Sequence, residues 1–186
     1  MPRHPACGLL AAAVCVLATA GPGLAQPVPE SERIPVDVRR TTLLVRDIDR
    51  SLAFWRDALG LTVIYDQVLG QPPDTTRLVL LRANDRFVGN IGLMRRSSDP
   101  QGVPVQYERP TTGQVIVVVN AKDLDTRLDR IKAVPGVRIR SGPERIEYPA
   151  PGGQNTIPVL VTYLWDPDGY FVEVNKILGT PAGAQQ

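Results

Sequence analysis

Apolar residues recur at helical spacing once in each half of the chain. In the first half they come at intervals of four, three and four residues, which places them on one face of a helix. Asp47 or Asp49 is the expected cap of this helix, and Gly60 is its expected end. The apolar face consists of Ile48, Leu52, Trp55 and Leu59.

The second half repeats this pattern. Asp123 is the expected cap of a second helix, whose apolar face carries Leu124, Leu128 and Ile131. Around both helices, alternating or β-branched runs predict strands, because successive side chains of a strand point to opposite faces. The expected strands cover residues 36–45, 61–65, 76–82 and 87–94 in the first half, and 114–119, 137–139, 159–165 and 170–176 in the second.

An internal repeat relates the two halves. Shifting the first half by 76 residues aligns six positions, more than a chance match of helix caps explains. Neither half can bury both faces of its sheet alone, but two halves side by side can. We therefore predict an α+β fold of two tandem β-α-β-β-β modules, at about residues 36–96 and 112–177, that form a curved mixed sheet around a cleft. The aligned pairs are Asp47/Asp123, Ile48/Leu124, Asp49/Asp125, Leu52/Leu128, Trp55/Ile131 and Gly60/Gly136.

The last two expected strands are joined by Asp-Pro-Asp-Gly at residues 166–169. Proline presets its own φ and glycine accepts a positive φ, so this sequence predicts the turn of a β-hairpin. Alternation then puts Phe171, Glu173 and Asn175 on one face of the outgoing strand. Because an unpaired carboxylate is costly to bury, Glu173 is expected to face water at the sheet edge or to point into a polar cleft.

The N-terminus has the pattern of a secretory signal peptide. Arg3 precedes an Ala-rich apolar run over residues 6–20, and cleavage is expected after Ala25, with Ala20 as the alternative. We therefore expect export to the periplasm or beyond, with no membrane anchor after cleavage. The expected segments are the signal peptide 1–25, a flexible lead-in 26–33, one domain 34–177 and a flexible tail 178–186.

Cleavage would change the chemistry that the chain can perform. The signal peptide holds the only histidine, His4, and both cysteines, Cys7 and Cys15, so the mature chain would contain neither residue type. This composition excludes disulfides, Ser-His-Asp and Cys-His catalysis, and the usual zinc sites. Without Arg3 the mature chain keeps 20 of the 21 basic residues against 19 acidic ones. There is no basic tract, so nucleic acid is not an expected partner.

Three segments resemble the vicinal oxygen chelate superfamily, and together with the repeat they extend the resemblance over residues 34–177. The segments are residues 41–61, which include Phe54-Trp55 and end in Leu-Gly-Leu, then Gly113-Gln114, then the closing Asp-Pro-Asp-Gly hairpin. The superfamily includes glyoxalase I, fosfomycin- and bleomycin-resistance proteins and extradiol dioxygenases. In it, the glutamate of the last strand is commonly a metal ligand, and Glu173 stands at that position.

The resemblance also places three further metal ligands, and this chain lacks all of them. Arg40 stands where a histidine is common on the first strand, and Gln114 or Ile116 is its counterpart in the second module. No carboxylate stands near Gly92, where the first module would supply one. We therefore expect no cofactor and no metal, with a divalent metal bound at Glu173 as the alternative.

The expected cleft is partly polar and partly apolar, as small-molecule sites usually are. Glu173 is read either as an edge carboxylate or as the partner of Arg40 in an ion pair at the vacated metal position. The cleft itself is read either as a binding site or as a core filled by side chains. Residues 141–158 are expected to form a long loop, as a lid or as plain surface. The expected lining consists of Arg40, Thr42, Gln114, Ile116, Phe171, Glu173 and Asn175.

The favoured function is a metal-free, exported protein that binds a small organic molecule in this cleft. The alternative is a lactoylglutathione-lyase-like or dioxygenase-like enzyme with Glu173 as its catalytic residue, assisted by Tyr163 or Tyr148. Export argues against a glutathione-dependent lyase, and the missing histidines argue against an iron dioxygenase. A third reading is a partner-binding homodimer with a vestigial cleft.

Overall fold

The computed structural model describes residues 28–100, 102–150 and 155–179. The expected signal peptide and nearly all of the expected tail lie outside these residues. Within the described chain, no helix is long and apolar enough to cross a membrane. A short 3₁₀ turn, η1 (Glu30–Glu32), precedes the first strand.

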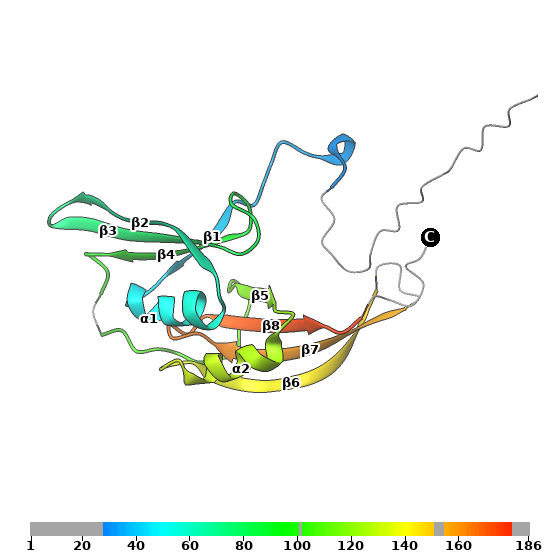
Figure 1. Ribbon diagram of the computed structural model, residues 1–186. Coiled ribbons are helices and arrows are strands. Elements are labelled where there is room, and N and C mark those ends of the chain that lie inside the picture. Colours follow the sequence, from blue (N-terminus) through cyan, green and yellow to red (C-terminus); the bar gives the residue numbers. More distant parts are fainter. Residues whose placement is uncertain (1–27, 101, 151–154, 180–186) are drawn as a thin grey trace, which may run out of the picture.

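The first module forms a four-stranded sheet in the order β1-β4-β3-β2. Its edge strand β1 runs parallel to β4, while the pairs β4–β3 and β3–β2 are antiparallel. A helical segment connects β1 to β2 (Figure 1). The elements are β1 (Arg40–Leu44), α1 (Ile48–Leu52), the π-helical η2 (Ala53–Ala58), β2 (Thr62–Gln71), β3 (Asp74–Arg82) and β4 (Asn90–Arg96).

The second module has the same connectivity, with the sheet order β5-β8-β7-β6. Its edge strand β5 is again parallel to the last strand of the module, β8. The predicted pair of β-α-β-β-β modules is therefore confirmed, as two four-stranded mixed sheets. The elements are β5 (Ile116–Asn120), α2 (Leu124–Ala133), β6 (Arg138–Pro149), β7 (Thr156–Trp165) and β8 (Phe171–Ile177).

The two helices begin at equivalent aspartates that behave differently. The Asp47 carboxylate accepts hydrogen bonds from the backbone N–H groups of Asp49 (2.9 Å) and Arg50 (3.1 Å), so it caps α1 as expected. Asp123 occupies the cap position of α2, but its side chain accepts no hydrogen bond from a backbone N–H of the helix. Its carboxylate instead pairs with the Arg127 guanidinium one turn along, at 2.6 Å, so the expected side-chain cap is wrong there.

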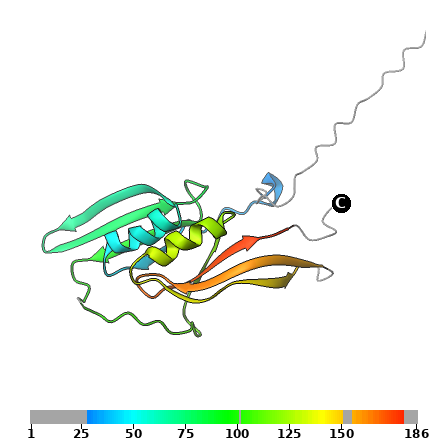
Figure 2. The same ribbon diagram turned by 60° about the horizontal axis from the view of Figure 1, so that its bottom comes forward.

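The modules pack against each other through their helices, which lie next to each other in Figure 2. Arg50 donates to the carbonyl of Pro135 behind α2 (3.4 Å), and Arg127 donates to the carbonyl of Ala58 at the end of η2 (3.2 Å). Each arginine lies over the glycine that ends the opposite helix. At Gly60, φ is 76° and an added Cβ would lie 2.7 Å from Arg127 Nη1, so only glycine fits.

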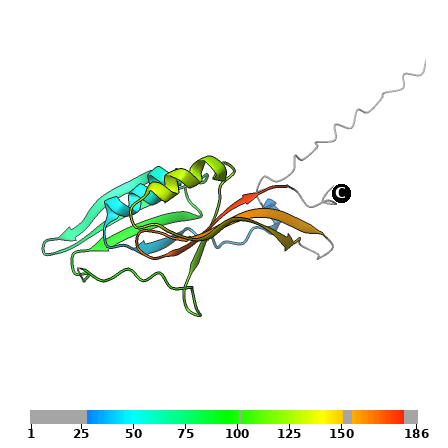
Figure 3. The ribbon, with the colours of Figure 1, turned by 90° about the horizontal axis from the view of Figure 1, so that it is seen from below.

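One hydrophobic core joins the two modules. Trp55 and Phe54 are fully buried, and their rings meet edge to face with centroids 5.0 Å apart. Val172 and Val174 of β8 belong to the same core, which confirms that Phe171, Glu173 and Asn175 share the opposite face of that strand. Both helices cover the same side of the molecule, and residues 97–100 and 102–115, hereafter the linker, run across the other side (Figure 3).

The expected loop over residues 141–158 is wrong. Among the described residues of this segment, those up to Pro149 belong to β6 and those from Thr156 belong to β7, and the two strands pair, so these residues form sheet rather than a lid. The sequence is misleading because Gly142-Pro143 looks like a loop signal, whereas the register shift between Ser141 and Glu144 absorbs it as a bulge. At the other end, β1 is shorter than expected and begins only at Arg40.

Trp55→Ala should destabilise the protein by ~3–5 kcal/mol, because the side chain is fully buried and the cavity left behind cannot collapse completely. Arg56→Ala is the matched control. Arg56 is the next residue, its side chain is exposed, and its ion pair is with the exposed Asp57. That variant should cost less than about 1 kcal/mol. Urea unfolding measures both, and equal midpoints for the two variants would show that Trp55 is not part of the core.

Candidate functional site at the module junction

The Asp-Pro-Asp-Gly turn between β7 and β8 is anchored by a buried carboxylate. Asp166 is fully buried. Its Oδ1 accepts hydrogen bonds from the backbone N–H groups of Asp168 and Tyr170, both at 2.9 Å. Its Oδ2 accepts a hydrogen bond from Trp55 Nε1 at 3.1 Å, across the module boundary. Burial raises the pKa of Asp166 to about 6, although these hydrogen bonds favour the ionised form.

The same turn satisfies the free edge of β1. Asp168 Oδ1 accepts a hydrogen bond from the backbone N–H of Arg46 (2.9 Å) and forms an ion pair with its guanidinium (3.1 Å). Asp168 Oδ2 accepts a hydrogen bond from Ser51 Oγ at 2.6 Å. The Tyr170 hydroxyl accepts from the Leu44 N–H (3.0 Å) and donates to the Leu44 carbonyl (2.9 Å). Side chains of the second module therefore satisfy the backbone groups at the C-terminal end of the β1 edge.

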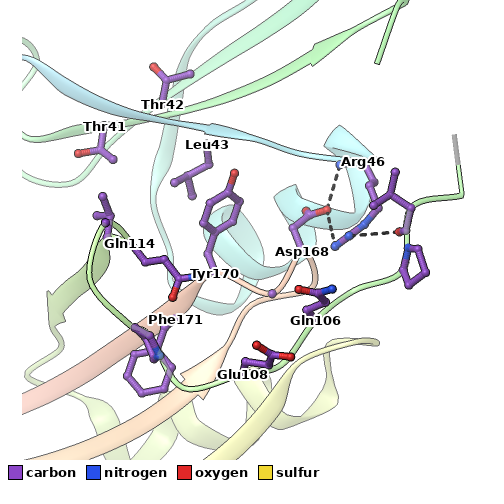
Figure 4. Close-up of a pocket in the computed structure, with 16 residues that line it drawn as sticks. Thr41, Thr42, Leu43, Arg46, Gln106, Glu108, Gln114, Asp168, Tyr170 and Phe171 are labelled. Carbon is purple, nitrogen blue, oxygen red and sulfur yellow. Dashed lines mark hydrogen bonds and ion pairs between the residues drawn. The ribbon is translucent and has the colours of Figure 1, made fainter. Parts of the chain in front are cut away.

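A cavity of about 600 Å³ opens beside this junction. Its walls come from β1 and Arg46, from the linker, and from the residues around the start of β8 (Figure 4). Apolar walls with a few polar groups are typical of small-molecule sites, and this volume suits a drug-sized ligand. The lining residues are Thr41, Thr42, Leu43, Arg46, Val103, Pro104, Gln106, Glu108, Pro110, Gly113, Gln114, Val115, Asp168, Gly169, Tyr170 and Phe171.

The linker wall is fixed from behind. Gln106 and Glu108 line the cavity, whereas Tyr107 between them packs away from it and donates its hydroxyl to the Gly136 carbonyl at 3.0 Å. Trp165 Nε1 donates to the Glu108 carbonyl at 2.9 Å. The wall also lies against Gly169, where φ is 89° and an added Cβ would stand 2.5 Å from the Gln106 carbonyl oxygen. Glycine is therefore required there by both conformation and space.

Three of the seven residues predicted to line the cleft line this cavity: Thr42, Gln114 and Phe171. Four others do not line it: Arg40, Ile116, Glu173 and Asn175. Gln106 and Glu108 also line the cavity, and no sequence motif marks them. The only signal for them was a proline-rich linker, since what an extended segment covers depends on its tertiary contacts.

Glu173 lies on the face of β8 that points away from the helices. Its carboxylate accepts a hydrogen bond from Asn175 Nδ2 at 2.7 Å. Among the described residues no ion pair joins it to Arg40, which is exposed at the start of β1. Its cross-strand neighbour is Tyr163. The Tyr148 hydroxyl, burial and the charge of Glu173 raise the pKa of Tyr163 to about 12, which keeps the phenol protonated at neutral pH.

The donors at the superfamily's metal positions do not fit a divalent ion. The equivalent residues Thr42 and Val118 pair with Gly92 and Glu173 respectively, so Gly92 is the counterpart of Glu173. The expected metal positions, namely Arg40, Gly92, Gln114 or Ile116, and Glu173, supply one carboxylate. In the described part of the chain, no three His, Cys, Asp or Glu side chains gather where they could hold a metal ion. One carboxylate is too few ligands for tight binding.

The fold and its repeat agree with the comparison against known families. The Glyoxalase/Bleomycin resistance protein/Dioxygenase superfamily matches residues 38–174, which is most of the chain. The chain therefore belongs to this superfamily. A search of curated proteins finds no match.

Solved structures share the fold at low sequence identity. The chain is similar to a glyoxalase family protein from Bacillus cereus, with a TM-score of 0.59 and 14% identity over 81% of this chain and 100% of that one. It is also similar to a glyoxalase/dioxygenase from Nostoc punctiforme, with a TM-score of 0.53 and 16% identity over 83% of this chain and 99% of that one. At this identity the likeness establishes the fold alone.

The pKa of Asp166 predicts an acid-side dependence of stability. The folded state keeps a proton on Asp166 up to about pH 6, whereas the unfolded chain releases it near pH 4. In this pH window the folded state therefore binds more protons than the unfolded state. The contribution of Asp166 to the free energy of unfolding falls as pH rises, by on the order of 3 kcal/mol. Urea unfolding between pH 4 and 7 should show this component in the wild type and lose it in Asp166→Asn. The prediction fails if the variant keeps the same pH profile.

Gly169→Ala should destabilise the protein more than Gly113→Ala. Both glycines have positive φ, 89° and 91°, so alanine strains either backbone by about 1 kcal/mol. Only at Gly169 does the new methyl group also meet the linker, since nothing lies within 4 Å of the Cβ position at Gly113. Hydrogen exchange of residues 103–110 should accelerate in Gly169→Ala only. Equal exchange in the two variants would contradict the packing described.

Proposed function

We propose that this protein is exported and binds a small organic molecule in the junction cavity without a catalytic metal. The single observation that carries the proposal is the cavity itself, about 600 Å³ in volume and walled by two modules and a fixed linker. Apolar walls, among them Leu43 and Phe171, would supply affinity through burial of a ligand. Polar side chains, among them Thr41 and Gln106, would supply orientation.

The metal-free part of the proposal rests on the available ligands. Arg40, Gly92 and Ile116 offer no side-chain ligand for a cation, and the Gln114 amide is a weak one, so Glu173 would have to hold a metal almost alone. The Asn175 amide already donates to that carboxylate. Glyoxalase-like or dioxygenase-like chemistry at Glu173 is therefore the less favoured function.

The export part rests on the sequence of the first 25 residues, which lie outside the described structure. A cleaved leader would leave the chain without His4 and both cysteines. Export would also separate the protein from the reduced glutathione that a glutathione-dependent lyase requires. A homodimer stays a prediction from the sequence.

The test is analysis of the protein purified without a histidine tag from the exported fraction of its native host. We expect an N-terminus near Gln26, substoichiometric metal by elemental analysis, and a co-purified small molecule in native mass spectra. Stoichiometric zinc, iron, nickel or manganese that disappears in Glu173→Ala would overturn the metal-free proposal and favour an enzyme. A mature protein that still begins at Met1 would overturn export.

A matched pair of valines tests whether the cavity is the binding site. Val115 and Val118 are similarly exposed, at 61% and 59%, but only Val115 lines the cavity. Val115→Trp should fill the space and remove the co-purified molecule, while Val118→Trp should leave it bound. Retention of the molecule in both variants would place its site elsewhere.

A further inference from the structure

The charged groups around the junction cavity do not balance. Three charged side chains line it: Arg46, Asp168 and Glu108. The side chain of Asp168 is only 5% exposed, and Arg46 and Asp168 neutralise each other in their 3.1 Å ion pair. Glu108 forms no ion pair with any residue that the structure describes. The lining therefore carries one uncompensated negative charge.

The positive charge of Arg46 is already committed. Besides the ion pair, its guanidinium donates to the carbonyls of Val103 and Pro167, each at 3.4 Å. An anionic ligand would have to compete with Asp168 for this arginine and would also approach Glu108. Both effects oppose the binding of an anion.

Two further arginines at or beside the linker do not line the cavity. Arg109 follows Glu108 in the linker but does not line the space. Arg138 stacks on the ring of Tyr107, with its guanidinium carbon 3.8 Å from the ring centroid. Successive side chains of the linker point to opposite sides, so Gln106 and Glu108 face the cavity while Tyr107 packs on the other side of the linker.

The wall opposite the linker offers apolar surface beside two threonine hydroxyls. In Figure 4, Glu108 and Gln106 lie across the cavity from Thr41 and Leu43, with Phe171 at one side. The Phe171 ring is 6% exposed and is held by Tyr163 and Trp165, whose ring centroids lie 5.9 and 5.6 Å away. An apolar surface therefore stands within the same space as a lone carboxylate.

We propose that the cavity selects small organic cations, in which an ammonium group pairs with Glu108 and an apolar body lies against Leu43 and Phe171. This inference rests on the proposed function, because it assigns the ligand class of the same cavity. Since Glu108 is exposed to solvent, salt should screen the pair, and the selectivity should be strongest at low ionic strength.

The experiment compares three probes that share a phenyl ring and a two-carbon arm: 2-phenylethylammonium, 2-phenylethanol and 3-phenylpropanoate. Binding to the purified protein is followed by NMR titration. At low salt the ammonium should bind about five-fold tighter than the alcohol, and the carboxylate should bind most weakly. Added salt should reduce the difference.

Two variants of equal net charge locate the effect. Glu108→Gln should abolish the preference for the ammonium while keeping the affinity for the alcohol. Glu144→Gln removes one negative charge from β6, away from the cavity lining, and should leave the preference unchanged. Val115→Trp should weaken all three probes, whereas Val118→Trp should weaken none.

The outcomes separate the two proposals. If the alcohol or the carboxylate binds as tightly as the ammonium, or if Glu108→Gln keeps the preference, the cation inference is wrong and the cavity remains a ligand site. If no probe shifts the resonances of the cavity residues, the inference and the proposed use of this cavity fail together.

Discussion

The structure depends on one turn, Asp-Pro-Asp-Gly-Tyr at residues 166–170, which belongs to the second module but satisfies the first. Asp166 accepts a hydrogen bond from Trp55 of the common core, Asp168 bonds to Arg46 and Ser51, and Tyr170 bridges both backbone groups of Leu44. An exposed sheet edge would otherwise leave unpaired N–H and C=O groups beside β1. The turn satisfies the backbone groups of Leu44 and Arg46 at the end of this edge, and its residues Asp168, Gly169 and Tyr170 form part of the cavity wall.

The repeat explains why the fold is symmetric, and its exceptions explain why the site is not. Both modules share strand order, helix position and the glycine that ends each helix. The equivalent positions Thr42 and Val118, or Gly92 and Glu173, carry side chains of different chemistry. Each module must bury its own helix and sheet, so the apolar pattern of the core occurs in both. The residues that line the cavity have no such requirement, so equivalent positions differ there.

Local patterns predicted most of the fold because they are fixed by neighbours in sequence. The stripe from Ile48 to Leu59, the Asp47 cap and the alternation around Val172 each depend on only a few adjacent residues. The misses have non-local causes. The bulge at Gly142-Pro143 continues a strand only because β7 lies beside it, and Glu108 faces the cavity only because Tyr107 and Trp165 hold the linker from behind. No periodicity in the linker sequence encodes those two contacts.

The geometry at Gly92 also constrains what this site can become. A Cβ at Gly92 would lie 2.8 Å from Thr42 Oγ1, on the strand that faces it in the sheet. A single substitution by glutamate there would meet Thr42 before it could offer a carboxylate to a metal. Supplying the missing ligand from the first module therefore requires the Thr42 side chain to move or to be replaced. Since Thr42 also lines the junction cavity, restoring a metal ligand would alter the proposed binding site, and the two functions compete for the same strand.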